Sequence, residues 1–257
     1  MDITYISLGV QCTIPLFLKN NNLRKEAYPF DWIISNPKFI YEILVLLLNN
    51  CNISDLVINH FFYCPLKADC AKIENYIISK NGFALYNSKY NVIFPHDKYN
   101  YNTVQKYIRR FERLKNIILN DNKIIHFIYI SQSSLDLGNF KINNVNIIDN
   151  VYTYINKIFD LISNYRKNFK IIVFDTILND NIILNKDIEL YKLDRCNSWI
   201  ELIPQVEKYI LNITQKAKLS DLKSLVILPN YDDNIKKTIK SMKINNYNLM
   251  LLKKMCK

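Results

Sequence analysis

Short apolar runs that alternate with longer amphipathic segments limit what this chain can fold into. The apolar runs have the length and β-branched content of strands: Ile3–Leu8, Ile124–Ile130, Lys170–Phe174 and Ile188–Leu193. The amphipathic segments have helical spacing: Thr103–Leu119, Val151–Tyr165 and Trp199–Ile213. Strands joined by helices of this length are typical of crossover connections between parallel strands. We therefore predict an α/β fold with a mainly parallel sheet and helices on both faces.

Local signals add detail to this prediction. The segment Val10–Asn22 has a helical pattern, and a second helix is predicted over Pro37–Asn49. Ser35 or Asn36 is suited to cap that helix, because Pro37 then takes its first position. Between Ile53 and Asn91 the periodicity is lost, so we expect short helices and a hairpin turning near Asn87-Ser88.

Composition and charge bound the domain organisation. The chain has 257 residues, of which 49% are hydrophobic, and no Pro/Gly/Ser-rich linker divides it. Its net charge is +11, and residues 216–257 alone carry ten lysines, no arginine and three aspartates. We predict an α/β domain over residues 1–215 and a Lys-rich extension over 216–257, with one more strand–helix–strand pattern in that extension.

Other features exclude some classes of protein. No uncharged apolar run reaches the ~18 residues of a membrane span, and no basic segment precedes an apolar one at the start. We therefore expect a cytoplasmic chain with reduced thiols. The six cysteines contain no CxxC pair and only three histidines are present, so we expect no metal site and no cofactor.

Chemistry in parallel sheets gathers where the strands end at their carboxyl edge. Cys12 follows the first predicted strand and lies at the mouth of the first predicted helix. The helix dipole and unpaired backbone N–H groups are expected to lower the pKa of such a thiol. His96, which follows the apolar run Val92–Phe94, is the best-placed base, and Asp97 or Asp31 is suited to orient its imidazole. The alternative is that Cys12 is a small buried hydrophobe.

Further candidates for substrate binding are Gly9, Gln11 and Ser131 at predicted strand ends, Trp32 in the loop before the second helix, and Arg24, which is suited to bind an anionic substrate or phosphate. Asp31 and Trp32 have a structural alternative, in which Trp32 packs in the loop and Asp31 caps the next helix. The helix face with Arg109, Arg110 and Arg113 is either an anion site or simply solvated. His126 lies within an apolar run and is expected to be a core histidine, and His60 to be structural.

Four segments together resemble the DUF1796 family of papain-like cysteine peptidases: ISLGVQC, FLKNNNLRKEAYPFDWI, PHD and KYIRRFERLKNII. The resemblance covers roughly residues 3–135. It implies that Cys12 is the nucleophile, His96 the base, and Asp97 or Asp31 the orienting acid. It also implies a helical lobe with the cysteine against an antiparallel lobe with the histidine, whereas the periodicity predicts a parallel sheet.

Three functions remain open at the level of sequence. The first is a cysteine-dependent hydrolase that cleaves a peptide or another acyl bond with Cys12 and His96. The second is a glycosyltransferase-like enzyme that binds a phosphate-bearing donor, with Asp175 and Asp194 at strand ends and the same cluster shaping its pocket. The third is a non-enzymatic binding protein, with nucleic acid held by the lysines of residues 216–257.

Overall fold

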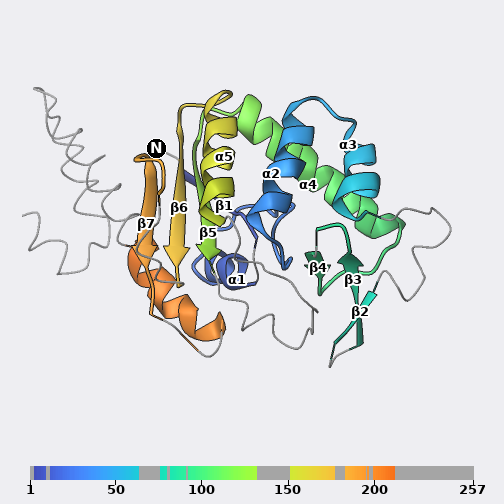
Figure 1. Cartoon of the computed structure of the whole chain (residues 1–257), viewed down its shortest axis with the longest axis horizontal. Coiled ribbons are helices and arrows are strands. Elements are labelled where there is room, and N and C mark those ends of the chain that lie inside the picture. Colours follow the sequence, from blue (N-terminus) through green and yellow to red (C-terminus); the bar gives the residue numbers. More distant parts are fainter. Residues whose placement is uncertain are drawn as a thin grey trace, which may run out of the picture. The chain divides into compact units, whose positions relative to one another are not determined.

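A computed structural model of the chain describes residues 3–9, 12–63, 76–79, 82–90, 92–131, 151–176, 183–194, 196 and 199–211. These residues belong to one compact unit, Met1–Leu211 (Figure 1). The second unit, Asn212–Lys257, lies outside the described residues, and with it the predicted extension 216–257 and its strand–helix–strand pattern. The boundary at residue 215 therefore stays a prediction.

The main sheet has four strands in the order β1-β5-β6-β7, and every neighbouring pair is parallel. Its strands are β1 (Ile3–Ser7), β5 (Ile124–Ser131), β6 (Phe169–Asp175) and β7 (Ile188–Lys192). Ser7 pairs with Ile128, so β5 runs three residues beyond the end of β1, and Ser131 pairs with Asp175 at the end of β6. The predicted α/β fold with a mainly parallel sheet is confirmed.

Helices cover both faces of this sheet. The ring of Phe159 on α5 (Val151–Ser163) packs on Phe169, with 5.1 Å between the centroids. On the other face, the ring of Tyr209, from the helical residues 202–211, packs on the ring of Tyr191 with 4.8 Å between the centroids. Phe169 and Tyr191 face opposite ways because Tyr191 pairs with Phe174, which is an odd number of residues beyond Phe169 along β6.

The predicted helices form close to their expected limits. They are α1 (Thr13–Asn20), α2 (Pro37–Leu48), α4 (Tyr101–Leu119) and α5 (Val151–Ser163), while α3 (Ile53–Asp55) is one of the short helices expected after Ile53 without set limits. Asn36 caps α2 by accepting a 2.9 Å hydrogen bond from the Phe39 N–H, which decides between the two predicted caps. The last predicted helix begins with a 3-10 turn, η4 (Trp199–Glu201).

A second sheet is antiparallel and has the order β2-β3-β4, and Phe94 at its edge packs on Tyr107 of α4 with 6.2 Å between the ring centroids. Its strands are β2 (Tyr76–Ser79), β3 (Gly82–Asn87) and β4 (Val92–Phe94). Asn87 pairs with Val92, which confirms the hairpin predicted near Asn87-Ser88. A π-helix, η1 (Leu56–Phe61), lies before the sheet, and Ile34 bridges to Ile93 of β4. That bridge joins the segment after Trp32 to the strand that precedes His96.

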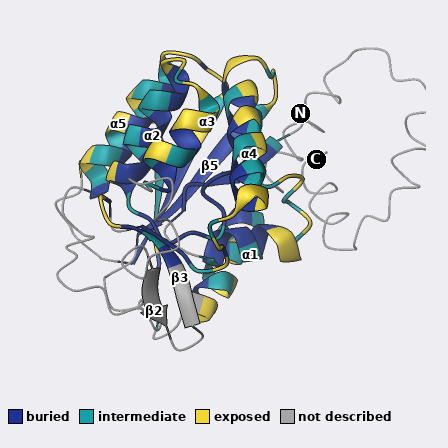
Figure 2. Ribbon diagram, turned by 90° about the vertical axis from the view of Figure 1, so that its right-hand side faces the viewer, coloured by how far each residue is buried: buried dark blue, intermediate teal, exposed yellow. Residues whose placement is uncertain are grey.

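The core is a continuous set of buried apolar side chains. In the ribbon of Figure 2, buried residues follow β5 and one side of α2 and of α4, whose other sides carry exposed residues. Phe61 lies at its aromatic centre, within 4.9 Å of Tyr107 and 5.0 Å of Phe111 between ring centroids. Among the described residues, none of the helices has the length and apolar character needed to cross a membrane.

Candidate functional site

Cys12 is the N-cap residue of α1, and in the chain it follows β1 and the described loop residues Leu8 and Gly9. Gly9 in this loop has φ of +80°, a conformation that favours glycine, and its N–H donates to Ser7 Oγ at 3.2 Å. A Cβ at Gly9 would lie 2.3 Å from Ser35 Oγ. Gly9 therefore shapes the loop before the cysteine, while Gln11 lies outside the described residues.

His96, which follows a strand of the antiparallel sheet, lies beside Cys12. It lies in a turn just after β4, and its Nε2 is 3.4 Å from Cys12 Sγ. This distance is within hydrogen-bond range for sulfur and suits a nucleophile and its base. The structure thus brings together two predicted site residues that are 84 positions apart in the chain.

The protonation of Cys12 differs from the sequence-based expectation. Burial raises the pKa of the Cys12 thiol to about 11, whereas a position at the start of a helix predicted a lowered pKa. The loss of hydration around the sulfur disfavours the thiolate. At neutral pH the resting group is therefore a thiol beside an imidazole, rather than a preformed thiolate.

Asp97 follows His96 in sequence, but its carboxylate accepts hydrogen bonds from other residues. Its Oδ1 accepts a hydrogen bond from Lys106 Nζ, and its Oδ2 accepts one from Tyr107 Oη at 2.7 Å. Both donors lie on α4. In the sequence, Tyr107 was expected on the apolar side of this amphipathic helix and Lys106 on the polar side, so no signal pointed to either as a partner of Asp97.

Asp31 is also paired away from the imidazole. It is 2% exposed, and its Oδ2 accepts from Arg24 Nη2 at 2.8 Å, Arg24 Nε at 3.1 Å and the Tyr28 N–H at 3.0 Å. Burial raises the pKa of Asp31, and the Arg24 charge counteracts this. Among the described residues, neither predicted orienting acid forms a hydrogen bond with His96, whose one hydrogen-bond partner there is Cys12.

Trp32 is the residue that packs against the imidazole. Its ring is edge-to-face with that of His96, with 6.0 Å between centroids and an interplanar angle of 88°. The Arg24 guanidinium lies 5.7 Å from the Trp32 centroid. Trp32 was expected either in the substrate pocket or as packing in the loop, and sequence alone held no signal for its contact with position 96.

Ser131 belongs to a separate polar cluster. It is fully buried at the end of β5, where its Oγ donates to Asp175 and its backbone carbonyl accepts from Thr176 Oγ1 at 2.8 Å. Ser131 shares the carboxyl edge of the sheet with Cys12, but no described contact joins them. Its predicted part in substrate binding stays a prediction.

The other histidines lie apart from this site. His126 is 4% exposed within β5, as expected for a core histidine, and burial lowers its pKa to about 4. Its Nδ1 has no hydrogen-bond partner among the described residues. His60 lies in η1. In the described part of the chain, no three His, Cys, Asp or Glu side chains gather as a metal site would require.

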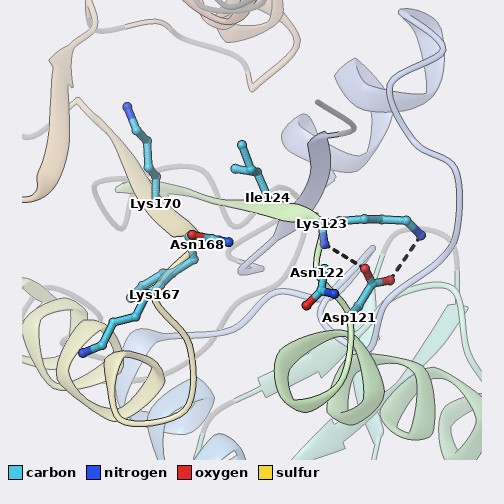
Figure 3. A pocket seen from close by; sticks show the side chains of 8 residues that line it. Asp121, Asn122, Lys123, Ile124, Lys167, Asn168 and Lys170 are labelled. Carbon is cyan, nitrogen blue, oxygen red and sulfur yellow. Dashed lines mark hydrogen bonds and ion pairs between the residues drawn. The ribbon is translucent and has the colours of Figure 1, made fainter.

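Two cavities lie at the opposite, amino edge of the parallel sheet. The one in Figure 3 has a volume of about 700 Å³ and is lined by residues that precede or begin β5 and β6. Lys123 and Asp121 form an ion pair of 3.2 Å at its rim (Figure 3). The second, of about 560 Å³, reaches Glu189 of β7. Neither cavity is lined by Cys12 or His96.

The family model described as "Putative papain-like cysteine peptidase (DUF1796)" matches residues 3–157, more than half of the chain. No curated protein and no solved structure matches the chain. His96 does follow an antiparallel strand, as the resemblance to papain-like peptidases implied, but Cys12 follows a strand of a parallel sheet. The matched residues include Cys12, Asp31, Trp32 and His96, and the chain belongs to the DUF1796 family.

Proposed function

We propose that this protein is a cysteine hydrolase that cleaves an acyl bond, with Cys12 as nucleophile and His96 as base. The observation that carries the proposal is the 3.4 Å distance between Cys12 Sγ and His96 Nε2. The family description supports cysteine hydrolase chemistry. The type of acyl bond, peptide or other, belongs to the proposal.

The raised pKa of Cys12 indicates when the proton moves. Because the resting thiol is protonated, proton transfer to His96 Nε2 accompanies attack of Sγ on the substrate carbonyl carbon. The new C–S bond forms as the carbonyl π electrons move to oxygen. A helix start is suited to stabilise such an oxyanion with backbone N–H groups, although in α1 Pro15 has no N–H and the Leu16 N–H donates to the Cys12 carbonyl at 3.0 Å.

The remaining steps return the enzyme to its resting state. His96 gives the proton to the leaving group as the carbonyl re-forms, which leaves an acyl group on Cys12. A water molecule then attacks the acyl carbon while His96 takes its proton. When the C–S bond breaks, that proton returns to sulfur and the acid product is released.

The contacts of the described residues give less support to a phosphate-binding transferase. Arg24 was a candidate for an anionic donor, but two of its nitrogens already bond to Asp31. Asp175 is buried and accepts the Ser131 hydroxyl. The lysines that motivated a nucleic-acid binder lie in residues 216–257, outside the described part of the chain.

Acetylation by p-nitrophenyl acetate tests the hydrolase. We expect acetyl transfer to Cys12, mapped by mass spectrometry, and its loss in Cys12→Ser. His96→Ala should slow acylation by about 100-fold, as expected when a general base is removed. Cys51→Ser is the matched control, because Cys51 is another half-buried free thiol, whose sulfur donates to the backbone carbonyl of Asn52 at 3.6 Å and has no histidine as a hydrogen-bond partner among the described residues. Equal acylation of Cys12 with and without His96 would refute the proposal.

A further inference from the structure

We propose that Trp32 is the positioning residue for His96, so that an aromatic ring does here what a carboxylate or an amide would otherwise do for a catalytic imidazole. The inference rests on the proposed function, because it matters only if His96 serves Cys12. An imidazole that acts as a base must hold one nitrogen toward the nucleophile.

The usual means of holding the ring is not used by the described residues. The Asp97 carboxylate accepts hydrogen bonds from Lys106 and Tyr107. The Asp31 carboxylate accepts them from Arg24 and Tyr28. Neither carboxylate therefore fixes the second ring nitrogen of His96. Something else must restrict rotation of this side chain if Nε2 is to stay near Cys12.

The edge-to-face contact with Trp32 meets this need. An interplanar angle of 88° at 6.0 Å between centroids is a favoured aromatic geometry, and it disfavours rotation of the imidazole about its Cβ–Cγ bond. The same contact leaves Nε2 on the side of Cys12 Sγ.

The backbone of Trp32 is a second and independent observation. Trp32 has φ of +65°, which bulky side chains rarely adopt and which is found most often where function requires it. Glycine or asparagine at this position would avoid the strain. A tryptophan held there indicates that the ring itself is needed.

Buried charges hold Trp32 in this conformation. Arg24 lies against the indole while its Nη2 and Nε bond to Asp31, the residue before Trp32. Asp31 in turn accepts the Tyr28 N–H, which closes the loop around a 2% exposed carboxylate. Asp31 therefore fixes Arg24 by hydrogen bonds, Arg24 packs on the Trp32 ring, and Trp32 packs on the His96 ring.

Alkylation of Cys12 by iodoacetamide as a function of pH, mapped by mass spectrometry, tests the inference. Trp32→Phe keeps a ring and should stay within about twofold of the unmodified chain, while Trp32→Leu should lose about tenfold near neutral pH. Trp32→Leu should also shift the pH profile toward that of His96→Ala, which a merely structural role would not do. Tyr165→Leu, the loss of an aromatic ring that is 41% exposed, is the control.

A second variant tests the role of the ring if Trp32→Leu does not fold. Trp32→Gly removes the ring together with the left-handed strain, and it should show the same loss of alkylation. A folded Trp32→Leu or Trp32→Gly with an unchanged pH profile would overturn the inference. If His96→Ala also left alkylation unchanged, the proposed function itself would fail.

Discussion

The Tyr107 hydroxyl donates a 2.7 Å hydrogen bond to Oδ2 of Asp97. The carboxylate that follows His96 in the chain is thereby directed into α4, where Lys106 binds its other oxygen. This contact ties the turn after β4 to the helix and explains how a short strand can hold the histidine in place. It also keeps the Asp97 carboxylate from orienting the His96 imidazole.

Replacing Asp97 should therefore affect stability more than reactivity. Asp97→Asn is expected to lower the free energy of unfolding by about 1–3 kcal/mol, since a buried acceptor of two hydrogen bonds is weakened. Alkylation of Cys12 should stay within about twofold of the unmodified chain. Chemical denaturation and iodoacetamide kinetics measure the two quantities. The control is Asp160→Asn on the exposed face of α5. A tenfold loss of alkylation in a folded Asp97→Asn would make Asp97 an orienting acid after all.

The Arg24–Asp31 pair should contribute far more than an exposed ion pair. Asp31 is 2% exposed, so Asp31→Asn leaves a largely buried guanidinium without its partner and should cost about 3 kcal/mol. Arg24→Gln leaves the buried carboxylate and should cost a similar amount, and the double variant should cost clearly less than the two together. Denaturation of the four proteins gives the coupling energy.

A matched exposed pair is available for that measurement. Arg113 Nε lies 3.2 Å from Glu26 Oε2, and the two side chains are 33% and 50% exposed. Glu26→Gln should cost less than about 1 kcal/mol. Similar costs for Glu26→Gln and Asp31→Asn would show that burial of the Asp31 pair does not matter to stability.

Gly9→Ala should destabilise the chain for two separable reasons. A φ of +80° costs a residue with a Cβ about 1–2 kcal/mol, and the added Cβ would overlap Ser35 Oγ at 2.3 Å. Ser35→Ala in the same chain should relieve the overlap but not the backbone strain, so it should recover only part of the loss. Thermal denaturation of the single and double variants measures both parts, with Ser35→Ala alone as the control. A neutral Gly9→Ala would contradict the described loop.

His126 should make the protein less stable in acid. Its folded pKa is about 4, because burial and the Lys170 charge disfavour the imidazolium, whereas the ordinary value is 6.5. Below pH 6.5 the unfolded chain binds a proton that the folded chain does not, so the free energy of unfolding falls as pH drops. The contribution is complete above pH 6.5 and lost as pH falls through about 4, with a size of about 3 kcal/mol.

Two substitutions isolate this effect. In His126→Phe, the free energy of unfolding should lose this part of its dependence on pH between 6.5 and 4, as measured by urea denaturation at several pH values. His60→Phe in η1 should keep that dependence. Parallel pH curves for the unmodified chain and His126→Phe would exclude His126 as the source.

Sequence determined the fold class because local patterns are enough for it. The β-branched run of β5 and the amphipathic repeat of α4 specify a buried parallel strand and a covering helix without any distant partner. The same holds for the hairpin at Asn87, whereas the cap of α2 was narrowed only to Ser35 or Asn36 until the structure showed Asn36. Cys12 and His96 were recognisable as candidates because each follows a predicted strand.

Tertiary structure alone decided how these candidates are used. The contact of Cys12 with His96 and of His96 with Trp32 joins segments far apart in the chain, and no local pattern encodes such a distance. The partners of Asp31 and Asp97 depend on which charges the folded chain buries beside them. The pKa of Cys12 was predicted in the wrong direction for the same reason: a helix start is visible in sequence, whereas the loss of hydration depends on every segment packed around the sulfur.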